Sequence, residues 1–182
     1  NALAEYVAGS RQAFVDMMNQ RIAELGCNES HFANPSGLND DTQRTTAYDM
    51  AIIARACFQN PTVLEIASAR TSTIPATANN PNGRTFSIEH KMLLSDDSNY
   101  YPDAIAGKTG WTSQAGQTLV TYARREGRGQ IAVTLKSTQK THYSDTKTIL
   151  DFCFAKFKNV NIADNEIENV TGDTPVTIAG ET

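Results

Sequence analysis

The residues best suited to chemistry in this sequence are Lys108, Thr109 and Gly110, in the stretch "AIAGKTGWTSQAGQTLV". An ammonium group and a hydroxyl at the edge of a strand can bind a carboxylate through charge-assisted hydrogen bonds. Gly110 would let an extended ligand lie beside that strand, since a Cβ atom there would obstruct it. Such a triplet also occurs by chance, and its lysine and threonine are then ordinary solvated side chains. The rest of the chain must decide between these two interpretations.

Composition excludes some classes of function. The 182 residues suffice for one domain of ordinary size, and the net charge of −4 argues against nucleic acid as a partner. No apolar run approaches the roughly 20 residues that would span a bilayer. Cysteines and histidines number three each and lie far apart, so no zinc site is expected. The cysteines are expected to be buried or half-buried thiols on helices.

Helical periodicity marks several segments that could support the triplet. We expect helices at about 1–9, 10–25, 46–60 and 61–68, and a closing amphipathic helix at 142–157. Met50, Ile53, Ala54 and Cys57 form the apolar stripe of the helix at 46–60, which Thr46 would cap.

Strands are expected in the second half of the chain. Two short strands at 70–76 and 83–90 flank the turn-rich "TANNPN", and a meander follows at about 104–111, 116–125 and 129–137. Ile131, Val133 and Leu135 alternate with smaller or polar residues, as in a half-buried strand. Arg124, Arg125 and Arg128 surround the last hairpin turn and are expected to form a solvated tip. Helices on a mostly antiparallel sheet indicate an α+β fold.

The ordered landmarks along residues 1–158 resemble one family, the serine-type D-alanyl-D-alanine carboxypeptidases, or low-molecular-weight penicillin-binding proteins. The stretches that carry the resemblance are "NALAEYVAGS", "FVDMMNQRIAELGCNESHFANPSGLND", "TTAYDMAIIARACFQNP", "AIAGKTGWTSQAGQTLVTYARREGRGQIAVTLKST" and "HYSDTKTILDFCFAKF". The resemblance implies a β-lactamase/transpeptidase-like fold, with an antiparallel sheet flanked by helices. Residues 1–158 would form a partial penicillin-binding domain. Residues 159–182, with a further strand expected at 174–180, would be a linker and the start of a truncated β-rich domain.

The resemblance also implies the chemistry. Lys108, Thr109 and Gly110 would bind the terminal carboxylate of a peptidoglycan stem peptide ending in D-Ala-D-Ala, and β-lactam antibiotics would mimic that peptide. The backbone N–H of Trp111 would supply half of an oxyanion hole. A serine would attack the peptide and form an acyl-enzyme, with no metal or cofactor. Such a protein would work outside the cytoplasm, in the bacterial cell wall or periplasm, either free or attached to the membrane through a further C-terminal segment.

The nucleophile of that mechanism is missing from the expected place. The family needs a Ser-x-x-Lys and a Ser-x-Asn motif before the Lys-Thr-Gly strand. This sequence has no Ser-x-Asn, and its two Ser-x-x-Lys matches, Ser137/Lys140 and Ser144/Lys147, both follow that strand. We interpret the first pair as part of a loop and Ser144 as a helix N-cap.

The sequence therefore resembles the C-terminal portion of a carboxypeptidase, which would be inactive alone. The nucleophile would lie upstream of Asn1, on the same polypeptide or on a separate chain. Two alternatives remain open. One is a serine β-lactamase-like hydrolase, disfavoured because the loop between helix and sheet lacks an obvious Glu-x-x-x-Asn segment and because "NPSGL" resembles the carboxypeptidases. The other is a non-catalytic module that binds cell-wall peptides.

Overall fold

The computed structural model describes residues 1–158, and the linker and strand predicted within 159–182 lie outside the described residues. Its α-helices are α1 (Ala2–Ala8), α2 (Arg11–Glu24), α3 (Ala47–Gln59), α4 (Pro61–Ser68) and α5 (His142–Lys156). All five match the predicted helices to within about two residues. In the described part of the chain, no helix has the length and apolar character needed to cross a membrane.

Side-chain caps explain where three of these helices begin. Thr46 accepts a hydrogen bond from the backbone N–H of Asp49, as predicted, and Ser10 accepts one from that of Ala13. Asn60 caps α4 in the same way and separates it from α3. Asn1 stands at the N-cap of α1 without a side-chain hydrogen bond.

The strands form two antiparallel sheets. A two-stranded ribbon consists of β1 (Thr71–Ile74) and β2 (Arg84–Ser87), and a three-stranded sheet consists of β3 (Ala104–Thr112), β4 (Gly116–Arg125) and β5 (Arg128–Ser137). The order β3-β4-β5 confirms the predicted meander. A short 3-10 helix, η1 (Lys91–Leu93), connects the ribbon to β3.

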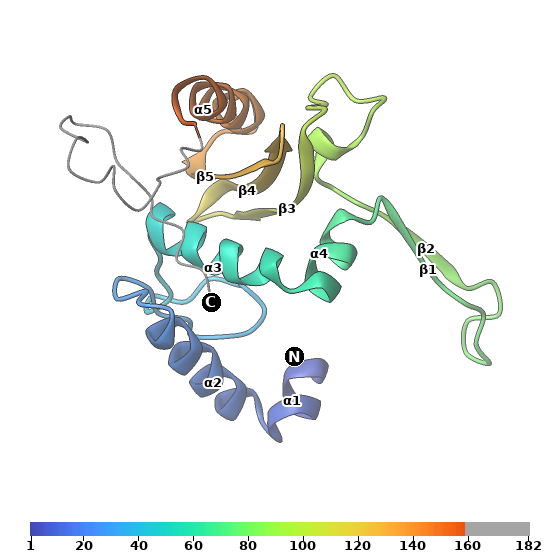
Figure 1. The fold of residues 1–182 in the computed structure, drawn as a ribbon. Coiled ribbons are helices and arrows are strands. Elements are labelled where there is room, and N and C mark those ends of the chain that lie inside the picture. Colours follow the sequence, from blue (N-terminus) through green and yellow to red (C-terminus); the bar gives the residue numbers. More distant parts are fainter. Residues whose placement is uncertain (159–182) are drawn as a thin grey trace.

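Helices cover both faces of the larger sheet. Figure 1 shows α5 on one face and α3 and α4 on the other, with the β1–β2 ribbon projecting from the body. The core between α5 and the sheet is built on residues with at most 5% exposure, including Met92, Leu119, Ala123, Leu150 and Phe154. The α+β architecture expected from the sequence is confirmed.

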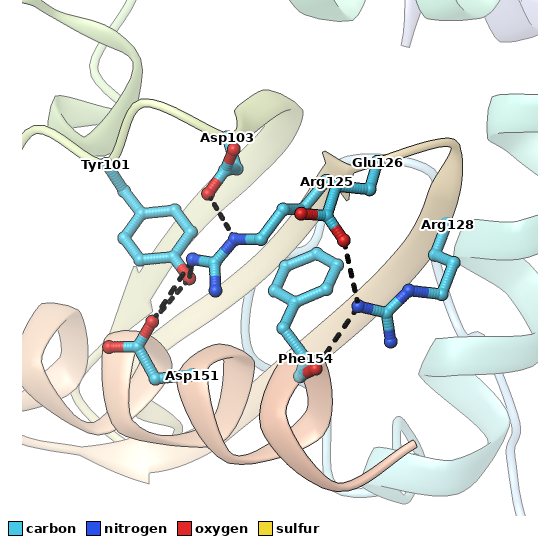
Figure 2. Close-up of polar contacts among 7 residues, drawn as sticks. All are labelled: Tyr101, Asp103, Arg125, Glu126, Arg128, Asp151 and Phe154. Atoms are coloured by element: carbon cyan, nitrogen blue, oxygen red, sulfur yellow. Dashed lines mark hydrogen bonds and ion pairs between the residues drawn. The ribbon is translucent and has the colours of Figure 1, made fainter. Parts of the chain in front are cut away.

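The arginines at the β4–β5 turn correct one prediction. Arg125 donates hydrogen bonds to Asp103 (2.8 Å) and to the hydroxyl of Tyr101 (2.7 Å), and it forms an ion pair with Asp151 of α5 (Figure 2). Its guanidinium group also lies 4.5 Å from the ring centre of Phe154. Arg125 therefore fastens α5 to the sheet instead of forming a solvated tip, because the hairpin turn ends beside the last turns of that helix.

Candidate active site

Strand β3 places Lys108 and Thr109 on opposite faces of the sheet. Lys108 pairs with Val120 and Thr109 with Leu119, and residues paired across strands share a face. Leu119 belongs to the core beneath α5, so Thr109 lies on the α5 side and Lys108 on the side of α3 and α4. Because β3 is an edge strand within the described sheets, an extended ligand could reach both side chains along its outer edge.

Lys108, Thr109 and Gly110 are together called the cradle, and both of its side-chain donors have partners within the chain. The Nζ atom of Lys108 donates to the backbone carbonyl of Thr109 at 2.6 Å. The hydroxyl of Thr109 donates to the Oε2 atom of Glu89 at 3.4 Å. These contacts show that both groups lie at the surface and that each can donate to an oxygen, which is the chemistry that binding a carboxylate requires.

A buried histidine supports β3 next to the cradle. His90 is 1% exposed, and its Nε2 atom lies 2.9 Å from the Thr121 hydroxyl on β4. Burial lowers the pKa of His90 to about 4, so the ring is neutral at physiological pH. A Cβ atom added to Gly107 would meet that ring at 2.6 Å. Only glycine therefore lets β3 pass this close to His90, one residue before Lys108.

An apolar groove of about 650 Å³ opens on the Lys108 face of the sheet. It lies among α3, α4, the base of the β1–β2 ribbon and β3, and both Gly107 and Lys108 line it. Its apolar wall includes Met50, Ile53, Phe58, Val63, Ile66 and Phe86. The cradle's ammonium group thus lies at the rim of a surface that is otherwise suited to apolar side chains.

A polar loop reaches the far end of β3. Buried Asp49, in the first turn of α3, accepts hydrogen bonds from the Ser30 hydroxyl (2.7 Å) and from the Glu29 backbone N–H (3.1 Å). These contacts anchor the loop that carries "NPSGLND". At its other end, Asn39 donates to the Ser113 hydroxyl at 3.2 Å, just beyond Trp111. The loop and the turn after β3 are therefore neighbours, a contact across 74 residues that the sequence did not predict.

The serines of the two Ser-x-x-Lys matches do not form nucleophile–lysine pairs. Ser137 ends β5 and contacts Thr141 and Asp145, not Lys140. Ser144 donates to the backbone carbonyl of Thr141.

The N-cap expected at Ser144 is wrong, because α5 begins two residues earlier and Thr141 occupies the N-cap position. Lys147 donates instead to the carbonyl of Ser98 at 3.4 Å. Neither serine has an activating lysine among its hydrogen-bond partners, so neither has the setting of a nucleophile.

Two residues beside the cradle were not predicted from the sequence: Glu89, which accepts from the Thr109 hydroxyl, and His90, which packs against Gly107. The only available signal was the position of "EH" at the end of the second predicted short strand, directly before "KMLL". Trp111 is 67% exposed, and a role for its backbone N–H in an oxyanion hole stays a prediction. Within residues 1–158, no three His, Cys, Asp or Glu residues are grouped so that they could hold a metal ion. The described cysteines are all free. Cys153 is half-buried on α5, as expected, whereas Cys27 is buried in a loop and Cys57 is exposed on α3, against the expectation.

Comparison with known sequences decides the family. A family model described as D-alanyl-D-alanine carboxypeptidase matches residues 1–139. The chain belongs to the D-alanyl-D-alanine carboxypeptidase family. Among its relatives, the D-alanyl-D-alanine carboxypeptidase DacB2 of Mycobacterium tuberculosis is 32% identical over 161 residues, which cover 85% of this chain and 52% of the relative.

Solved structures of carboxypeptidases and transpeptidases have the same fold. The carboxypeptidase DacD of Francisella tularensis superposes with a TM-score of 0.79 at 26% identity, covering 97% of this chain and 51% of that structure. The Streptomyces K15 DD-transpeptidase superposes with a TM-score of 0.73 at 27% identity, covering 79% of this chain and 55% of that structure. The resemblance deduced from the sequence is therefore confirmed at the level of family and fold. The chain spans about 40 to 50% of the length of the curated relatives it matches, such as 39% of DacF from Bacillus subtilis and 52% of DacB2.

Proposed function

We propose that this chain forms the carboxylate-binding half of a peptidoglycan D-alanyl-D-alanine carboxypeptidase. The observation that carries the proposal is the position of Lys108 and Thr109 at the edge of β3, next to a groove, in a member of this family. The terminal carboxylate of a D-Ala-D-Ala stem peptide, or the carboxylate of a penicillin, would displace Glu89 and the Thr109 carbonyl from the two donors. The work would take place outside the cytoplasm, where such peptides are cross-linked.

The proposed chemistry is acyl transfer through a serine supplied by a segment outside residues 1–182. That serine would attack the carbonyl of the scissile bond, D-alanine would leave, and water would hydrolyse the acyl-enzyme. The backbone N–H of Trp111 would donate to the oxyanion. Lys108 would hold the carboxylate, and its positive charge would also favour the negative charge that develops nearby.

The apolar groove supports the idea of a second segment. A soluble protein seldom leaves a large concave apolar surface uncovered, and such surfaces usually mark contacts with another element. A segment packed there would lie beside Lys108, which lines the same groove. We propose that the segment with the nucleophile covers this groove, either as part of the same natural polypeptide or as a separate chain.

The test is covalent labelling of the natural protein with a fluorescent penicillin, followed by intact mass measurement and peptide mapping. We expect the label on a serine outside residues 1–182, release of D-alanine from a diacetyl-L-lysyl-D-alanyl-D-alanine peptide, and no labelling of residues 1–182 alone. Lys108→Ala should slow both reactions by about 100- to 1,000-fold, by analogy with the loss of one preorganised donor in an oxyanion hole. A label on Ser137 or Ser144 would contradict the proposal.

A further inference from the structure

Glu89 is held beside the cradle by its own backbone and by its neighbours. The N–H of Ile88 donates to the Arg70 carbonyl at 2.9 Å, and the Tyr143 hydroxyl of α5 donates to the Glu89 carbonyl at 3.3 Å. The next residue, His90, is buried against β4. The backbone is therefore held on both sides of Glu89, which places its Cα beside β3, and the exposed side chain reaches the Thr109 hydroxyl at 3.4 Å.

The charge of Glu89 has no cationic partner among the described residues. None of the ion pairs formed within residues 1–158 includes Glu89 or Lys108. Lys91, two residues along the chain, is paired with Asp97 instead. The side chain of Glu89 is exposed, and its hydrogen bond comes from the Thr109 hydroxyl.

We propose that Glu89 is an internal competitor that occupies the hydroxyl of the cradle and sets its affinity for carboxylate-ended ligands. This inference rests on the proposed function, because it assumes that Lys108 and Thr109 bind a ligand carboxylate. A hydroxyl has one proton to donate. While Thr109 donates to Glu89, it cannot donate to a ligand, and a ligand carboxylate that approaches Thr109 meets a like charge.

The size of the effect follows from Coulomb's law. Two carboxylates about 5 Å apart at an exposed site repel each other by roughly 1 kcal/mol, which corresponds to about a fivefold change in a dissociation constant. Removing the charge should therefore tighten binding of a small carboxylate about 3- to 10-fold. A ligand whose carboxylate is replaced by an amide should not respond, because it carries no charge to repel.

The experiment measures binding of N-acetyl-D-alanine and of its amide to residues 1–182. Backbone amide shifts of Gly110 and Trp111 report binding by NMR, and Trp111, the single tryptophan of the chain, gives an independent fluorescence signal. Glu89→Gln removes the charge and keeps an acceptor, whereas Glu89→Ala removes both. Glu24→Gln on α2 removes the same charge away from β3 and serves as the matched control.

The inference is supported if Glu89→Gln binds N-acetyl-D-alanine with a dissociation constant about 3- to 10-fold lower than that of wild type, and if Glu89→Ala binds it at least as tightly as Glu89→Gln. The dissociation constant of the control variant for N-acetyl-D-alanine, and that of every variant for the amide, should equal the wild-type value. Equal constants for wild type and both Glu89 variants would overturn the inference and leave the proposed function standing. Absence of binding to every variant would overturn the carboxylate cradle itself, and with it both proposals. Loss of binding in Lys108→Ala confirms that the signal comes from the cradle.

Discussion

Gly107→Ala is the substitution whose cost can be worked out most directly from the structure. The added Cβ atom would lie 2.3 Å from the backbone carbonyl oxygen of Val120 and 2.6 Å from two atoms of the His90 ring. Neither neighbour can give way easily, since one is backbone of the central strand and the other is a buried ring that is 1% exposed. Strand β3 would have to move away from β4 by about 1 Å to restore ordinary van der Waals contact.

The expected loss of stability is about 1.5–3.5 kcal/mol. Overpacking of this kind costs about 1–3 kcal/mol, and a lengthened ladder hydrogen bond adds roughly 1 kcal/mol. Replacing glycine by alanine also lowers the conformational entropy of the unfolded chain, which offsets about 0.5 kcal/mol of this loss of stability. For a chain of this size the melting temperature should fall by roughly 3–14 °C.

Urea unfolding followed by circular dichroism measures this cost, and Gly110→Ala provides the comparison on the same strand. A Cβ atom at Gly110 would meet only the Thr118 hydroxyl at 2.5 Å, and that side chain can rotate away. We expect Gly110→Ala to lose less than about 1 kcal/mol of stability while weakening ligand binding. A Gly107→Ala protein within about 0.5 kcal/mol of wild type would refute the argument that β3 is held against His90 by close packing.

Two further changes test the surroundings of the sheet. The pKa of His90 is lowered from 6.5 to about 4 in the folded chain, so between these pH values the unfolded chain is protonated at His90 and the folded chain is not. The free energy of unfolding should therefore fall by up to about 3 kcal/mol as the pH drops from 6.5 to 4. His90→Gln should remove that part of the pH dependence in urea titrations, and an unchanged slope would contradict it. Arg125→Met should lower the free energy of unfolding by about 1–2 kcal/mol, because it removes the contacts with Asp103 and with the Phe154 ring. Asp151→Asn should lower it by less, and a double-mutant cycle should show that Arg125 and Asp151 are coupled.

Local patterns predicted the elements because their causes are local. Ser10 and Thr46 cap their helices through hydrogen bonds within three residues, and the pattern of each stretch is enough to locate them. The cradle residues were found for a similar reason, since Lys108, Thr109 and Gly110 are consecutive. Contacts such as Asn39 to Ser113 and Glu89 to Thr109 join residues 74 and 20 positions apart, and no periodicity encodes them.

Strand β5 was predicted correctly as a strand, but the face predicted to be buried was the wrong one. Its larger apolar residues, Ile131 and Val133, were expected on the buried face, but Ala132 and Thr134 are the buried ones, at 1% and 9% exposure. The reason is the close approach of α5, whose Thr146 hydroxyl lies 2.9 Å from that of Thr134. Small side chains let the helix come near, and the larger ones lie half-buried on the face toward α3.

The apolar stripe of α3 links the sequence pattern to the proposed function. Met50, Ile53, Ala54 and Cys57 predict one covered helix face, yet only Ala54 is buried, and all four line the groove. A helical stripe predicts that a face is covered and does not say by which segment. Met50 and Ile53 are half-buried and Cys57 is exposed, so the stripe is only partly covered and could accept a further apolar element. Since Lys108 lines the same groove, an element packed against α3 would also lie beside the cradle, as we propose for the segment with the nucleophile.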